Sequence, residues 1–196
     1  MAFIHTVTDD EVTDEARPFF ESDRERLGYV ANYTRLFAQR PEVEVARRQL
    51  LTAIAKNLGP RRYELVTVAA AGKLRSSYCT LAHGKVLADE HLSASSVREL
   101  VLDPHTAGLD DVELAIVDFA RKIIDDATSV IPADIERLRE LGLSDVEILD
   151  VALAASVRCF VSKTLDAFCV EADSIYAELD GELRRTLTVG RSIVPD

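Results

Sequence analysis

Three side chains that can take part in chemistry lie close together in the segment 64–83, ELVTVAAAGKLRSSYCTLAH. Ser76, Cys79 and His83 are separated by three and then four residues, so on one helix they would share a single face. A hydroxyl, a thiol and an imidazole would then converge. Because only a small fraction of a free thiol is thiolate at neutral pH, a neighbouring base or hydrogen-bond donor decides whether such a cysteine reacts or is an inert small hydrophobe.

A carboxylate, Glu64, begins the same segment, fifteen residues before Cys79. On one continuous helix the two residues would be about 22 Å apart. They can meet only if the chain turns back between Gly72 and Ser77. We therefore expect two helices joined by a tight turn, with Gly72 as the break in the first helix.

The spacing of these residues resembles the signature of the AhpD-like alkylhydroperoxidase and carboxymuconolactone decarboxylase superfamily. That signature is Glu, eleven residues, Cys-x-x-Cys, three residues and His, and this chain matches it at Glu64, Cys79 and His83. Ser76 replaces the first cysteine, and Tyr78 stands where the best-known hydroperoxidases have a histidine. The segments before and after the motif are similar to the peroxidase-related branch of the superfamily, so the likeness covers roughly residues 27–173.

The resemblance implies an all-α fold, a compact multi-helix AhpD-like bundle in a single domain, and a thiol-dependent reduction of alkyl hydroperoxides. Cys79 would attack the peroxide, while Glu64 and His83 would relay the proton. Ser76 cannot form the disulfide of the two-cysteine members, but its hydroxyl can donate a hydrogen bond to the Cys79 sulfur. Tyr78 is expected to be a pocket wall or a hydroxyl donor.

The electron path is open at this point. Regeneration would need an external thiol, a redox-protein reductant, or one of the distant cysteines Cys159 and Cys169, which have the character of ordinary core cysteines. One alternative is a carboxymuconolactone decarboxylase-type lyase that uses Glu64 and His83 as acid and base. Another is a redox-inactive helical homologue that has lost the cysteine pair. The resemblance also implies a homo-oligomer, either a dimer, a trimer or a hexamer.

Composition limits the other classes of function. The 196 residues suit one domain, and the net charge of −11 argues against nucleic acid or an anionic membrane surface as the main partner. Three cysteines without a disulfide spacing suit a reducing cytoplasm. We expect no signal peptide, because the first residues turn acidic, and no membrane span, because no apolar run reaches the necessary length. No cofactor is expected, and no metal, since only Cys79 and His83 cluster among possible ligands.

Helical periodicity dominates the chain. We expect an N-terminal arm over 1–26, interrupted by Pro18, a core over 27–173 and a C-terminal extension over 174–196. A capping box at Ser144 and Glu147 predicts the start of the longest helix. The helices expected in the core cover 27–39, 41–57, 61–71, 109–126, 131–141 and 144–168.

Overall fold

The structure is a computed structural model that describes residues 2–192. Met1 and the last four residues of the expected C-terminal extension lie outside the described residues. Over the described range the chain forms helices and no strands. The helices are α1 (Arg17–Leu27), α2 (Asn32–Phe37), α3 (Pro41–Leu58), α4 (Pro60–Lys73), α5 (Ser77–Glu90), α6 (Ala94–Leu102), α7 (Asp111–Asp126), α8 (Pro132–Glu140), α9 (Asp145–Ala167) and α10 (Gly181–Leu187), with 3-10 turns at Pro104–Thr106, Ala127–Ser129 and Ser174–Glu178.

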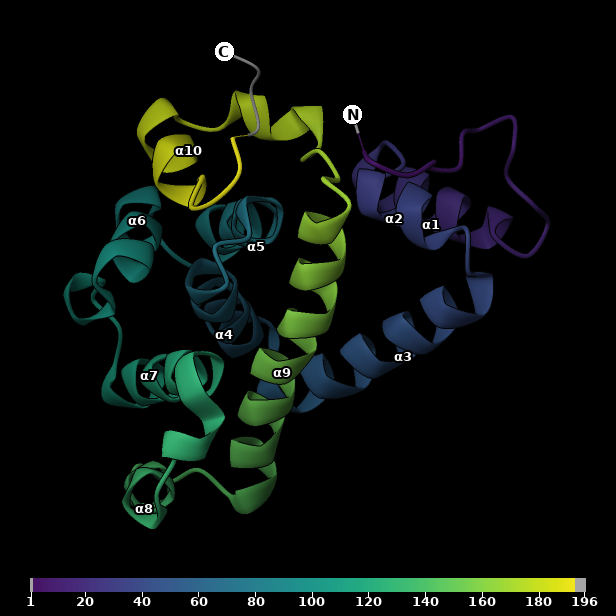
Figure 1. Cartoon of the computed structure of the whole chain (residues 1–196). Helices are drawn as coiled ribbons and strands as arrows, with labels where there is room; N and C mark the ends of the chain where they lie inside the picture. Colours follow the sequence, from purple (N-terminus) through teal and green to yellow (C-terminus); the bar gives the residue numbers. More distant parts are fainter. Residues whose placement is uncertain (1, 193–196) are drawn as a thin grey trace.

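Helix α4 is the centre of the bundle. It packs against α5, α7 and α9 (Figure 1), and its apolar residues are buried on nearly every side, as the sequence predicts. A helix that is apolar all round cannot face water, so three neighbours must cover it. The residues of α4 with no exposed surface are Leu65, Val66, Thr67, Val68, Ala70 and Ala71.

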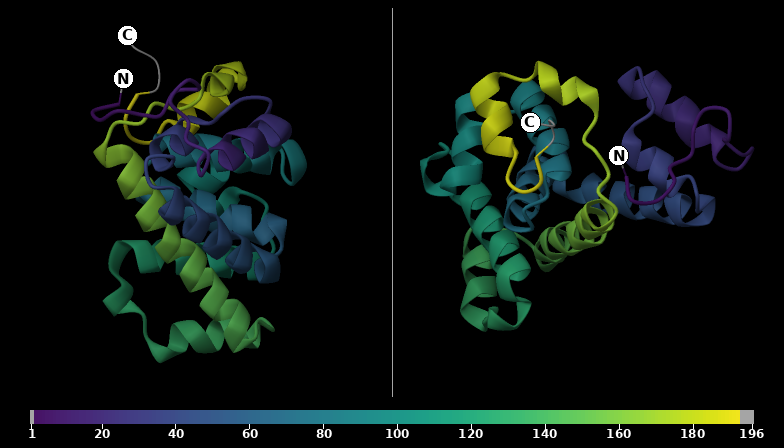
Figure 2. Two further views of the ribbon diagram at one scale, coloured as in Figure 1. Left: turned by 90° about the vertical axis from the view of Figure 1, so that its right-hand side faces the viewer. Right: turned by 45° about the horizontal axis from the view of Figure 1, so that its top comes forward.

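Helix α3 carries the N-terminal part of the chain to the opposite side of α9 from α6, α7 and α8 (Figures 1 and 2). Polar bonds tie α2 back to the bundle. The Asn32 amide donates to the carboxylate of Asp173 at 2.8 Å, and the Tyr33 amide donates to the hydroxyl of Tyr78 at 3.3 Å. The segment containing α1 and α2 therefore faces α5 and the C-terminal part of the chain.

Three sequence predictions about helix ends are wrong. The helix expected over 27–39 is broken, because Gly28 adopts a left-handed conformation (φ +82°) that ends α1, and Ala31 is extended before α2 begins. Pro18 does not interrupt the arm but lies in the first turn of α1, where the missing amide proton costs nothing. Gly72 is no break, since α4 continues to Lys73.

The predicted start of the longest helix is confirmed. The Ser144 amide donates to the Glu147 carboxylate at 2.8 Å, and the Glu147 amide donates to Ser144 Oγ at 3.3 Å, which completes the capping box of α9. This box fixes where α9 begins.

The segment after α9 packs onto the bundle. Leu187 of α10 has no exposed surface and lies against Gly84 of α5, where a side chain would collide with it. The hydroxyl of Thr80 donates to the Leu187 carbonyl at 2.5 Å. The C-terminal segment thus covers one side of α5. No helix within residues 2–192 combines the length and the apolar character that crossing a membrane requires.

Candidate active site

The turn between α4 and α5 brings Glu64 beside His83. Arg75 takes the left-handed conformation (φ +56°), and the Ser76 amide donates to the Ala71 carbonyl at 3.0 Å, so the chain reverses within three residues. Nδ1 of His83 lies 2.7 Å from Oε2 of Glu64. The structure therefore turns back between Gly72 and Ser77, as the spacing requires.

Cys79 lies in the first turn of α5 and is 2% exposed. His83 follows one turn later, and both side chains line a cavity of about 440 Å³. No hydrogen bond between these two side chains is among the contacts of the described structure, so a proton passing from one to the other needs a water or a substrate in the cavity. The first turn of a helix favours negative charge, which suits a thiolate at this position.

A buried arginine contacts the sulfur. Nη1 of Arg158 on α9 lies 3.7 Å from Sγ of Cys79, and the arginine is only 2% exposed. Its Nε is buried without a hydrogen-bond partner in the described chain. Burial opposes the charge of Arg158, but the neighbouring Cys79, Tyr63 and Glu64 outweigh it and raise the pKa of the guanidinium. Arg158 is thus a fixed positive charge in contact with the Cys79 sulfur.

Sequence reasoning missed Arg158. The signal was a lone arginine in the apolar run VALAASVRCFV, because a buried arginine requires a partner. Nothing in the sequence shows that the partner is Cys79.

Burial lowers the pKa of His83, and the charge of Arg158 lowers it further, although Glu64 acts in the opposite direction. His83 is therefore neutral at pH 7. A carboxylate only accepts hydrogen bonds, so Nδ1 of the neutral ring carries the proton that Glu64 accepts. Nε2 then has a free lone pair and is the basic atom of the site.

Ser76 does not lie on the same helical face as Cys79 and His83. It is the extended residue before α5, and its buried hydroxyl has no hydrogen-bond partner within the described residues, so the expected bond to Cys79 is not formed. Burial raises the pKa of Asp166, and Ser76 lies near enough to lower it in part. The two side chains nonetheless form no hydrogen bond of ordinary geometry. The prediction of a shared helical face fails because α5 begins at Ser77, one residue after Ser76.

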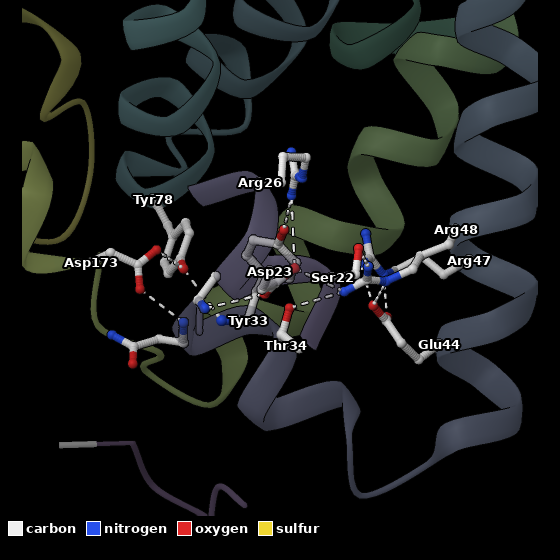
Figure 3. Close-up of polar contacts among 12 residues, drawn as sticks. Ser22, Asp23, Arg26, Tyr33, Thr34, Glu44, Arg47, Arg48, Tyr78 and Asp173 are labelled. Carbon is white, nitrogen blue, oxygen red and sulfur yellow. Dashed lines mark hydrogen bonds and ion pairs between the residues drawn. The ribbon is translucent and has the colours of Figure 1, made fainter. Parts of the chain in front are cut away.

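Tyr78 separates the Cys79 cavity from a second cavity of about 800 Å³, and it lines both. Its hydroxyl donates to Asp173 at 2.5 Å and accepts the Tyr33 amide (Figure 3). Burial and the charge of Asp173 raise the pKa of Tyr78 well above its usual value, so the hydroxyl keeps its proton. The phenol is a wall of the pocket whose hydroxyl is already engaged.

The other two cysteines lie elsewhere. All three cysteines are free, Cys159 is on α9, and Cys169 lines the second cavity. Neither lines the cavity that contains Cys79. Among residues 2–192 no three His, Cys, Asp or Glu side chains are grouped so that they could hold a metal ion.

Solved structures match the chain along nearly its whole length, whereas no protein-family model and no curated protein sequence matches it. An uncharacterized peroxidase-related protein with an alkylhydroperoxidase AhpD core, from Ralstonia eutropha JMP134, superposes with a TM-score of 0.83 at 20% identity, over 97% of this chain and 98% of that one. The chain has the AhpD-like fold. The expectation of an all-α AhpD-like bundle is therefore confirmed.

Two further solved structures are similar to the chain. An uncharacterized peroxidase-related protein from Silicibacter sp. TM1040 has a TM-score of 0.81 at 24% identity, over 88% of this chain and 94% of that one. A cysteine-to-alanine variant of the debrominase Bmp8, in complex with 2,3,4-tribromopyrrole, has a TM-score of 0.74 at 12% identity, over 88% of this chain and 92% of that one. At these identities the likeness shows the fold alone.

Proposed function

We propose that the protein is a thiol-dependent peroxidase that reduces organic hydroperoxides with the single cysteine Cys79. The observation that carries this proposal is the contact between the Arg158 guanidinium and the Cys79 sulfur, inside a cavity that also contains the Glu64–His83 pair. A cation on the sulfur favours a thiolate, and a neutral histidine nearby can take up and return a proton.

The chemistry balances with these groups. Nε2 of His83 accepts the thiol proton, through water, and leaves the Cys79 thiolate beside Arg158. The sulfur attacks one peroxide oxygen, the O–O bond breaks, and the leaving oxygen takes the proton from His83 to become an alcohol. The sulfur is oxidised to a sulfenic acid, and the peroxide is reduced. Glu64 holds the ring of His83 and stabilises its protonated form during the transfer.

The sulfenic acid is reduced by an external thiol. Among the described residues Cys79 is the only cysteine that lines its cavity, so the cavity offers no second thiol for an internal disulfide. A first thiol condenses with the sulfenic acid and releases water, and a second thiol regenerates Cys79 and leaves as a disulfide. Small thiols are plentiful in a reducing cytoplasm, which is where we expect this chain to work.

Acid–base catalysis by Glu64 and His83 alone is the second candidate. The 2.7 Å pair is competent for proton transfer without the sulfur, as a lyase of the carboxymuconolactone decarboxylase type would require. This candidate gives no reason for a buried guanidinium to contact Cys79, so the thiol-dependent reaction is favoured.

The test is the mass of the intact protein after one equivalent of tert-butyl hydroperoxide, with and without a small thiol. Wild-type protein should gain one oxygen at Cys79 or, with the thiol, a mixed disulfide there. Cys159→Ser, which changes a cysteine outside the cavity, should behave like wild type, and Cys79→Ser should consume no peroxide. Peroxide consumption that persists in Cys79→Ser would contradict the proposal. So would an unmodified Cys79 in the wild type.

A further inference from the structure

Four arginines line the Cys79 cavity, although the chain as a whole carries a net charge of −11. Arg158 is on α9, Arg26 is on α1, and Arg47 and Arg48 are on α3. Figure 3 shows the last three of these side chains. Such a local concentration of guanidinium groups is unfavourable unless anions neutralise it. The ion pairs of each arginine therefore show which of these charges is already neutralised.

Two fully buried carboxylates neutralise the arginines of α3. Glu44 accepts two hydrogen bonds from Arg47, at 2.6 and 2.7 Å, and one from Arg48 at 2.6 Å. Asp23 accepts one from Arg48 at 3.1 Å and another from the Ala31 amide at 3.2 Å. The hydrogen bonds that these two carboxylates accept thus come from the α3 arginines and the backbone.

Arg26 forms only a long ion pair, with a carboxylate that Arg48 already binds. Its nearest carboxylate, Asp23, is 3.8 Å away, and its side chain is 60% exposed. Nη2 of Arg26 donates instead to the hydroxyl of Tyr33 at 3.2 Å. No acceptor for the Tyr33 hydroxyl proton is found among the described residues. The charge of Arg26 also lowers the pKa of His83, so it acts on the Glu64–His83 pair.

The charges of the cavity do not cancel. With Cys79 as a thiol and His83 neutral, four guanidinium groups face the carboxylates of Asp23, Glu44 and Glu64. Asp173 lies beyond Tyr78, in the second cavity together with Arg35. One positive charge remains. The rest of the lining is aromatic and aliphatic, and it includes Tyr78, Tyr176, Val161 and Leu165.

We infer that the Cys79 cavity binds small organic acids, with the carboxylate held by Arg26 and Tyr33 and an apolar or aromatic body directed toward Cys79. A guanidinium next to a hydroxyl donor matches the two oxygens of a carboxylate. A volume of about 440 Å³ suits a small molecule. The inference deepens the proposed function, on which it rests for the reacting group: the substrate would be a hydroperoxide or peroxy acid that carries a carboxylate.

The experiment measures binding of benzoate and of its neutral counterpart benzamide by calorimetry, on the full chain carrying Cys79→Ser, so that no thiol chemistry is needed. Benzoate should bind at least about tenfold more tightly than benzamide, because a hydrogen bond to a charged group contributes a binding free energy that corresponds to such a ratio of dissociation constants. Arg26→Gln should remove most of the preference, and Tyr33→Phe should reduce it. Arg17→Gln removes the same charge from the same helix, and Arg17 is comparably exposed and pairs with Asp14 away from the cavity, so this control should bind benzoate as before.

Equal binding of benzoate and benzamide, or no binding of either, would overturn the inference. Equal losses in Arg26→Gln and Arg17→Gln would also overturn it, because they would reveal only a general effect of charge. The two proposals fail separately. If benzoate binds through Arg26 but peroxide leaves wild-type Cys79 unmodified, the carboxylate site is supported and the peroxidase proposal is wrong. If peroxide oxidises Cys79 but benzoate does not bind, the peroxidase proposal is supported and the carboxylate site is wrong.

Discussion

Arg158 and Cys79 are 79 positions apart in the sequence, yet Nη1 of the arginine lies 3.7 Å from the sulfur. The contact makes α9 part of the site, although the motif in 64–83 contains no residue of that helix. It also explains how a positive charge can remain in the interior, since it faces a group that becomes negative on losing its proton. The cation that contacts the sulfur therefore comes from outside the motif.

Replacing Arg158 should slow the reactions of Cys79. Arg158→Met keeps most of the side-chain volume but removes the cation, so we expect alkylation of Cys79 by iodoacetamide at neutral pH to slow by about tenfold or more. Arg158→Lys, which retains a charge on a thinner side chain, should recover part of the rate. Peptide mass spectrometry over time measures the rate at Cys79. Equal rates in wild type and Arg158→Met would show that the guanidinium does not influence the sulfur.

The histidine should titrate below its ordinary value of 6.5, because burial and Arg158 lower the pKa of His83. The basic form then persists as the pH falls, and we expect peroxide reduction to fade only below pH 6.5. Glu64 raises the pKa of His83, so Glu64→Gln should move its titration to still lower pH. NMR of the imidazole protons measures both shifts, and the signal missing in His83→Gln identifies the residue. A His83 that titrates above 6.5 would contradict this prediction.

The same shift links stability to pH. The unfolded chain takes up a proton on His83 near pH 6.5, while the folded chain does so only at lower pH. The contribution of this histidine to stability is therefore complete above about pH 6.5 and is lost as the pH falls toward the lower folded-state pKa. Wild-type protein should lose more of its unfolding free energy than His83→Gln between pH 7 and pH 5, as measured by urea denaturation. Parallel losses would contradict a lowered pKa.

The fold was largely predictable because its signals are local. The apolar composition of α4 predicts a central helix, Ser144 and Glu147 predict the start of α9, and the distance between Glu64 and Cys79 requires the turn that the structure contains. A periodic pattern cannot show where a helix is interrupted, and the break at Gly28 was missed for that reason. There the left-handed glycine outweighs a run of residues that could all be helical.

The candidate site was predictable only where its residues share one helix or one turn. Glu64 and His83 are nineteen positions apart, and the resemblance of the motif to the family signature implies that they pair. Arg158 and Arg26 arrive from α9 and α1, and contacts between distant segments leave no mark in a single sequence. Ser76 was misplaced because a shift of one residue at a helix end changes the direction of a side chain.

Two helical glycines should respond oppositely to alanine. A methyl group at Gly84 would lie 2.7 Å from the buried Leu187 side chain, so Gly84→Ala should destabilise the protein by about 1 kcal/mol or more as α10 shifts. Gly72 has open space around it, and Gly72→Ala should stabilise helix α4 by about 0.5–1 kcal/mol. Thermal unfolding should move by about 2–4 °C per kcal/mol, in opposite directions. A stabilising Gly84→Ala would show that α10 does not pack on α5.

Introducing a second sulfur tests the electron path. Ser76→Cys creates a pair of cysteines three residues apart at the start of a helix, a spacing that supports a reversible disulfide. The Ser76 hydroxyl has no hydrogen bond to lose, so rotation of a thiol toward Cys79 should cost little. One equivalent of hydroperoxide should then give an intramolecular disulfide, seen as a loss of two hydrogens in the intact mass, and small thiols should no longer be trapped as mixed disulfides. Ser77→Cys adds a sulfur one position later, where the native hydroxyl accepts the Gly190 amide, and it should retain the one-cysteine behaviour. A sulfenic acid that persists in Ser76→Cys would mean that position 76 is held away from the Cys79 sulfur.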